Sequence, residues 1–246
     1  MVYGLPLQTE ESLSRTIHEV LTLVPDRIAF YSYAHVPWTS KGQRLFDETH
    51  LPNPDQKLKL HQVGKELFLN AGYDYIGMDH FALPGDDLAI AHKQGRLHRN
   101  FMGYTTQKTS MLIGLGVSSI SDIGIAFAQN EKILERYYSR IFSDNELPIV
   151  KGYFLSEEDL KIKNYILDIS CKGKTNFKQE DLPMLEKIVF PKLFEMQLDG
   201  LLNFDQEGLF VTDLGRQFTR NICSAFDLKL MLSKEEACQP VFSKAV

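Results

Sequence analysis

The sequence predicts an α/β fold in which strands and helices alternate in the first part, followed by a mostly helical second part. Up to about residue 80, short apolar runs alternate with amphipathic segments of helical period. This pattern is typical of right-handed βαβ units built on a parallel sheet. After about residue 150, capped helical segments and one hairpin pattern replace the alternation.

Five elements are expected in the first part, and each has a local signal. Thr9 is a helix N-cap with acidic residues behind it, and Pro25 ends that helix. Its apolar face is predicted to comprise Leu13, Ile17, Val20, Leu21 and Val24. The five elements are a strand at 2–5, the helix capped by Thr9, a strand at 27–34, a helix at 55–69 and a strand at 73–78.

The middle of the chain is less regular. The glycine-studded stretch 111–121 predicts a strand followed by a tight turn. Its Gly114-Leu115-Gly116 favours a packed strand end, where the backbone closely approaches another segment, over a phosphate-binding loop.

The last third predicts a small winged-helix-like module. Ser156 caps one helix, and a second helix at 181–198 is bent or split at Pro191. A hairpin is expected at 201–211, followed by a helix capped by Thr212. We place a boundary near 143–151, which divides the chain into domains 1–145 and 150–246.

Composition limits the functional classes. The net charge is -5, and residues 151–246 carry 13 Lys and Arg against 15 Asp and Glu, so we expect no nucleic-acid partner. No run is apolar enough to span a membrane, and no secretory signal is recognisable. Cys171, Cys223 and Cys238 form neither a disulfide framework nor a metal-ligand spacing, which favours a cytoplasmic protein without a bound metal.

Two polar groups of the stretch 77–107 are candidate site residues. Asp79 and His80 follow a predicted parallel strand, where they could form a site or a hydrogen-bonded pair that holds a loop. Arg99 lies among aromatic and small residues, a mixture that favours a pocket for carboxylates over a solvated run of charges. His35 also follows a strand, and a structural role is the commoner one for such a histidine.

Several of these stretches, in this order, resemble the C-terminal part of the oxygen-independent coproporphyrinogen III oxidases, a radical S-adenosyl-L-methionine (SAM) family. They are VYGLPLQTEES, PDRIAFYSYAHVP, GYDYIGMDHFALP, LHRNFMGYTTQ and GLGVSSIS, and RNICSAFD resembles the end of the family's C-terminal domain. HRNFMGYTT is the most specific piece, and the resemblance covers essentially the whole chain.

The resemblance implies a fold, a reaction and a set of site residues. The fold is the C-terminal part of a partial (β/α) radical SAM barrel with a winged-helix-like domain behind it. The reaction is the oxygen-independent oxidative decarboxylation of coproporphyrinogen III to protoporphyrinogen IX in haem biosynthesis. A 4Fe-4S cluster reduces SAM to a 5'-deoxyadenosyl radical, and two propionates become vinyl groups.

By the same resemblance, Phe101 and Met102 lie in a segment important for activity, although Met102 replaces the glutamine of some members. Val2, Ala34 and Ile120 fall where the family contacts SAM. The residues expected to face the substrate are Asp79, His80, Arg99, Gly103, Tyr104 and Thr105.

The family's CxxxCxxC and Gly-Gly-Thr motifs are not in this sequence. We therefore expect a fragment whose partners include the missing N-terminal part, which would hold the cluster, and an electron donor that the sequence does not identify. The competing hypothesis is a non-enzymatic tetrapyrrole-binding or haem-chaperone-like protein.

Overall fold

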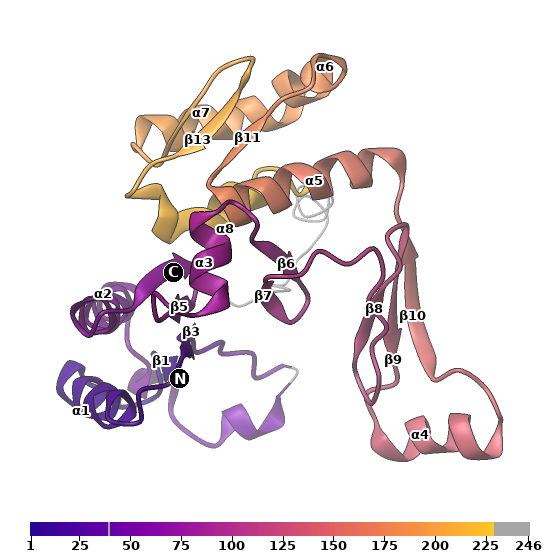
Figure 1. Ribbon diagram of the computed structural model, residues 1–246. Helices are drawn as coiled ribbons and strands as arrows, with labels where there is room; N and C mark the ends of the chain where they lie inside the picture. Colours follow the sequence, from indigo (N-terminus) through magenta and orange to yellow (C-terminus); the bar gives the residue numbers. More distant parts are fainter. Residues whose placement is uncertain (39, 229–246) are drawn as a thin grey trace.

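The computed structural model describes residues 1–38 and 40–228. It has a mixed α/β fold, as the sequence predicts. Figure 1 shows the first strands with α1 and α2, a layer of C-terminal helices above them, and a separate antiparallel sheet, β8 to β10, at one side. No helix within the described ranges is long and apolar enough to cross a bilayer.

The first βαβ unit forms as expected. Strand β1 (Val2–Tyr3) pairs in parallel with β3 (Tyr31–Ser32), and α1 (Glu10–Leu21) connects them. Thr9 and Ser12 cap α1 reciprocally. The predicted apolar face is wrong at Val24, because the helix ends at Leu21 and Val24 is exposed with a φ of 46°.

The next sheet differs from the expected parallel arrangement. The predicted strand at 27–34 is split into β2 (Arg27–Ala29) and β3, and β4 (Asp74–Gly77) follows the expected helix α2 (Pro54–Asn70). An unpredicted strand, β5 (His80–Ala82), lies between β2 and β4 and is antiparallel to both. Strands β2 and β4 therefore run in the same direction without pairing. The aromatic residues Tyr3, Phe30, Phe68 and Phe81 form the core of this part.

The middle of the chain forms two antiparallel units. Strands β6 (His98–Asn100) and β7 (Gly103–Thr105) make a hairpin, and β8 (Ile120–Asp122), β9 (Ala126–Asn130) and β10 (Ile149–Phe154) make a sheet. The prediction of a strand over 111–121 is wrong for most of its length, since only β8 is regular. The expected close approach is confirmed at Gly114, where a Cβ would lie 2.8 Å from the Ile120 carbonyl oxygen.

The C-terminal elements form a core of their own. Ser156 and Asp159 cap α5 (Glu157–Lys172), and a π-helical turn (Leu185–Val189) splits the predicted helix just before Pro191. The expected hairpin β12 (Leu202–Phe204) and β13 (Gly208–Val211) is joined by an unpredicted third strand, β11 (Lys174–Asn176). The predicted helix capped by Thr212 is instead a 3-10 turn (Gly215–Phe218) with Leu214 at its N-cap, followed by the short helix α8 (Thr219–Ser224). The Thr212 hydroxyl accepts a hydrogen bond from the Gly215 backbone at 3.0 Å.

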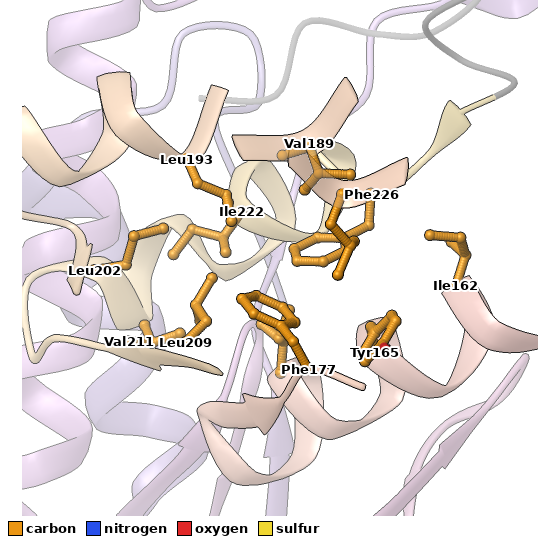
Figure 2. Packing of buried hydrophobic residues seen from close by; sticks show 13 residues of the cluster. Ile162, Tyr165, Phe177, Val189, Leu193, Leu202, Leu209, Val211, Ile222 and Phe226 are labelled. Carbon is orange, nitrogen blue, oxygen red and sulfur yellow. The ribbon is translucent and has the colours of Figure 1, made fainter. Parts of the chain in front are cut away.

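Figure 2 shows how α8 closes this core. Phe226, just after α8, lies between Val189 of the split helix and Tyr165 of α5, whereas Ile222 lies near Leu193 and the hairpin residues, and both are fully buried. The remaining helical elements are short: Lys41–Arg44, Glu48–His50, α3 (Asp87–Lys93), α4 (Leu134–Tyr138) with the π-helical turn Ser139–Ser143, Gln179–Asp181, α6 (Leu182–Met184) and α7 (Phe190–Leu198).

The division into domains 1–145 and 150–246 stays a prediction. Strand β10 pairs with β9 along its length, so residues 149–154 share a sheet with the first part. The elements packed around the C-terminal core begin with α5.

Candidate functional site

The turn between β4 and β5 depends on a glycine. Gly77 has a φ of 150°, and a Cβ at this position would lie 2.7 Å from the Tyr104 hydroxyl oxygen. A larger residue would therefore be both strained and in collision with Tyr104. The close approach lets the turn place Asp79 and His80 beside the β6–β7 hairpin.

Asp79 is buried at this turn and forms an ion pair with the C-terminal helix. Only 8% of its surface is exposed, and Arg220 of α8 donates a hydrogen bond to its Oδ2. Burial raises the pKa of Asp79, while the positive charges of Arg220 and Arg99 oppose this rise. The pair joins two residues that are 141 positions apart.

His80 is held between two aromatic rings. Its ring lies edge-on to Tyr31 and Tyr104, with centroid separations of 6.0 and 5.3 Å. Its Nδ1 is buried and has no hydrogen-bond partner within the described part of the chain. Burial lowers the pKa of His80, and Arg99 and Arg220 lower it further, so the ring is neutral near pH 7.

Arg99, like His80, has a buried nitrogen that lacks a hydrogen-bond partner among the described residues. Its Nε is buried, and none of the described residues accepts a hydrogen bond from it. The guanidinium lies 5.8 Å from the centroid of the Tyr104 ring, and the Tyr104 hydroxyl donates to the Ser170 carbonyl of α5 at 2.8 Å. An unpaired buried guanidinium nitrogen is costly, which makes Arg99 a candidate ligand for an anion.

Arg99 borders a cavity of about 440 Å³ between the β6–β7 hairpin, the β8–β9 strands and α5. Phe101 and Phe127 meet edge to face at its wall, with centroids 5.1 Å apart. Lys163 of α5 forms an ion pair with Asp122 of β8 at 2.8 Å. The walls of the cavity are mostly apolar and carry two cationic and three acidic side chains, a mixture that suits an amphipathic ligand with both charged and apolar parts.

Four predicted residues lie away from this cavity or at its rim. Met102 is 85% exposed at the tip of the β6–β7 hairpin, while Phe101 is about half exposed. The Thr105 hydroxyl accepts a hydrogen bond from the Gln107 backbone. Gly103 has a φ of 124°, and a Cβ there would lie 3.1 Å from His80 Nε2. The hairpin therefore depends on this glycine next to His80.

The residues proposed to contact SAM lie on different elements. Val2 lies in β1 and Ala34 follows β3, but Ile120 belongs to β8, which Figure 1 places in the separate sheet. The Ala34 carbonyl accepts a hydrogen bond from Gln43 at 3.0 Å. The proposed SAM contacts therefore stay a prediction.

The described cysteines do not fit a 4Fe-4S cluster. Burial raises the pKa of Cys171 to about 12 and also raises that of Cys223, so neither is a thiolate near pH 7. Within 1–38 and 40–228, no group of three His, Cys, Asp or Glu could hold a metal ion. Cys238 lies outside the described residues.

Some residues of this region were not predicted from local patterns. Arg220 belongs to the RNICSAFD stretch, but nothing in the sequence pairs it with Asp79. Lys163 and Phe127 occur in ordinary helix and strand patterns, so no signal distinguishes them. His35 lies 3.0 Å from Glu48, a contact consistent with a structural role.

Comparisons with known proteins find relatives named oxygen-independent coproporphyrinogen III oxidase. A relative from Thermostichus vulcanus, named oxygen-independent coproporphyrinogen III oxidase, is 39% identical over 252 residues, which cover 100% of this chain and 76% of the relative. Relatives of the same name from Escherichia coli K12 and Pseudomonas aeruginosa are 38% and 40% identical, with 54% and 50% of their lengths covered. The chain thus spans about half the length of most curated relatives it matches.

The solved structure of coproporphyrinogen III oxidase (HemN) from Escherichia coli, described as a radical SAM enzyme, superposes on this fold with a TM-score of 0.85. The match has 38% sequence identity and covers 93% of this chain and 54% of that one. No family model matches the chain. From the identity to its relatives and the share of the Thermostichus vulcanus protein that it covers, we conclude that the chain belongs to the oxygen-independent coproporphyrinogen III oxidase family.

Proposed function

We propose that the chain is the substrate-binding C-terminal part of an enzyme that converts coproporphyrinogen III to protoporphyrinogen IX without oxygen. The reaction is the oxidative decarboxylation of two propionates to vinyl groups in haem biosynthesis. The names of the relatives support this proposal. The single observation that carries it is Arg99, whose buried Nε lacks a partner among the described residues at the edge of the 440 Å³ cavity.

The substrate has a chemistry that matches this cavity. Coproporphyrinogen III carries four propionates on a large apolar macrocycle. Cavities that bind small molecules measure about 300–1,000 Å³ and are mostly apolar, with a few polar groups that fix orientation. Arg99 supplies a fork of donors that suits a carboxylate, and the ring of Tyr104 shields one side of it. The proposed role of Arg99 is to hold one propionate.

The other proposed contacts lie around Arg99. His80 stays a proposed substrate contact, with a neutral ring whose buried Nδ1 has no partner in the described chain. Asp79 does not face the substrate as an unpaired carboxylate, because it is paired with Arg220. Its proposed role is to orient the turn that carries His80. Phe101 and Met102 stay proposed members of an activity segment, with Phe101 at the cavity wall.

We also propose the finer fold assignments that the resemblance implies. The parallel pair β1–β3 would be part of a partial (β/α) barrel, and domain 150–246 would be winged-helix-like. The three-stranded sheet β11–β13–β12, packed with α5 and α8, supports the second assignment. The cluster and SAM would be held mainly by the N-terminal part of the enzyme, with Val2, Ala34 and Ile120 as additional SAM contacts.

A binding titration of the 246-residue chain tests the proposed substrate. Coproporphyrin III, the stable fluorescent oxidised form, should bind, and Arg99→Gln should weaken binding about tenfold to a hundredfold because a charge-assisted hydrogen bond is lost. Arg96→Gln is the matched control, since Arg96 lies in the same segment but is exposed and contacts Gln94. No binding by the unmodified chain, or equal binding by the Arg99 variant, would contradict the proposal.

A second measurement tests the reaction. The chain joined to the N-terminal part of the Escherichia coli relative should convert coproporphyrinogen III anaerobically, and Arg99→Gln should reduce conversion. A correctly assembled hybrid with a loaded cluster but no product would contradict the proposed activity while leaving substrate binding intact.

A further inference from the structure

The cavity beside Arg99 contains acidic as well as basic side chains. Asp122, Asp159 and Asp227 border it together with Arg99 and Lys163. Asp159 is engaged at the start of α5, where its Oδ2 accepts hydrogen bonds from the Ser156 backbone at 2.9 Å and the Tyr153 hydroxyl at 2.5 Å. The carboxylate of a ligand therefore meets a cavity wall without a strong net positive charge. To hold it, a second cationic side chain besides Arg99 would have to leave the carboxylate with which it is paired.

Lys163 is the cationic side chain that can leave its present ion pair. Its Nζ lies 2.8 Å from Asp122 Oδ2 and 4.8 Å from the centroid of the Phe127 ring. The side chains of Lys163 and Asp122 are 27% and 22% exposed, so water reaches the pair. Such partly solvated ion pairs contribute little to the free energy of folding. Replacing the Asp122 carboxylate by a ligand carboxylate as the partner of Lys163 therefore costs little free energy.

Asp122 has other hydrogen bonds that remain if Lys163 leaves it. Its Oδ1 accepts a hydrogen bond from the Gly124 backbone at 2.8 Å, and its own backbone exchanges hydrogen bonds with Leu112. The strand and turn around Asp122 therefore keep their shape without Lys163. The released carboxylate retains one donor and contact with solvent, which limits the penalty for breaking the ion pair.

We propose that Lys163 is a second carboxylate ligand of this cavity and that a propionate binds by displacing Asp122 from it. The inference rests on the proposed function, because it takes the substrate to be a tetrapyrrole with propionates. Arg99 approaches from β6 and Lys163 from α5, so the propionate joins the two parts of the chain. Asp122 acts as an internal competitor that keeps the cavity closed to weakly bound anions.

The two partners of this ion pair are expected to respond in opposite directions. In the coproporphyrin III titration, Lys163→Met should weaken binding about tenfold, because one charged ligand is lost. Asp122→Asn should tighten binding up to about fivefold, because Lys163 no longer has to leave a carboxylate. If the pair were only structural, both substitutions would weaken binding.

A double substitution distinguishes the exchange of carboxylates at Lys163 from a general effect of the net charge of the cavity. Asp122→Asn should give no gain when Lys163 is already Met, whereas a general loss of negative charge would tighten binding in both backgrounds. The tetramethyl ester of coproporphyrin III should not distinguish the variants. The matched control is the ion pair between Lys172 and Asp168 on the same helix, at 2.7 Å, where neither Lys172→Met nor Asp168→Asn should change affinity.

The outcomes of the two proposals can be told apart. If the unmodified chain binds coproporphyrin III and Arg99→Gln weakens binding, the proposed substrate stands. If Asp122→Asn then fails to tighten binding, or does so in the Lys163→Met background as well, the exchange is refuted. Circular dichroism of each variant identifies any that has failed to fold, and Lys163→Arg, which keeps the charge, should restore most of the affinity.

Discussion

Acidification should destabilise the first core through His61. This histidine of α2 lies against two aromatic residues, with its ring centroid 5.4 Å from that of Tyr3 and 6.2 Å from that of Phe30. Burial lowers its pKa from 6.5 to about 4, and the nearby charge of Lys65 acts in the same direction. The folded protein therefore resists protonation of a ring that the unfolded chain protonates readily.

The sign and size follow from proton linkage. Because the folded pKa lies below the unfolded one, the contribution of His61 to stability is fully present above pH 6.5 and is lost as the pH falls toward 4. Relative to its value above pH 6.5, the free energy of unfolding is lower by about 2 kcal/mol at pH 5 and by about 3 kcal/mol at pH 4. Domains of this kind have a stability of about 5–15 kcal/mol, so the loss is measurable.

Urea denaturation at pH 7 and pH 5 measures this difference, with His61→Phe as the comparison. The phenylalanine keeps an aromatic ring between Tyr3 and Phe30 and cannot be protonated. The variant should therefore lose about 2 kcal/mol less than the unmodified chain between the two pH values. An equal loss in both proteins, or a His61 pKa near 6.5 by nuclear magnetic resonance, would refute the reasoning.

Three further outcomes are expected. With iron and sulfide under anaerobic conditions, the 246-residue chain should not assemble a stoichiometric 4Fe-4S centre, since Cys171 is buried, Cys223 is partly buried, and burial raises the pKa of both thiols. A cluster signal by electron paramagnetic resonance would contradict this. Gly77→Ala should cost about 2–4 kcal/mol of stability through backbone strain and collision with Tyr104, whereas Gly42→Ala, with no atom nearby, should be neutral in the same urea titration. Ser156→Ala should cost about 1 kcal/mol because α5 loses its N-cap, while Ser156→Asp, which can still cap, should not.

Local signals predicted the individual elements well. The caps at Thr9 and Ser156, the split before Pro191 and the hairpin near 201–211 all involve residues within a few positions of one another. Such features depend on backbone groups that nearby side chains satisfy, so a short window of sequence contains the cause. The error at Val24 shows the limit, because apolar spacing continued past the point where helical hydrogen bonds ended.

Pairing between distant segments was not predictable in the same way. Strand β5 has only three residues, and although its pairing with β4 is local, its pairing with β2 joins residues more than 50 positions apart. Arg99 was expected in a pocket because of its aromatic neighbours, and it does border a cavity. Lys163 and Arg220 carry no local mark of their contacts with Asp122 and Asp79, which only the folded chain creates.

The contact between Asp79 and Arg220 also sets an order of events during synthesis. The two residues are 141 positions apart, so at about 5–20 residues per second the ribosome needs about 7–30 s to add the second after the first. During that interval Asp79 lacks its ion-pair partner Arg220, and Arg99 is the nearer arginine in the sequence. The ion pair of Asp79 therefore forms only after the C-terminal helix has been made. Since the same turn carries His80, the candidate site is completed only when almost the whole described chain has been made.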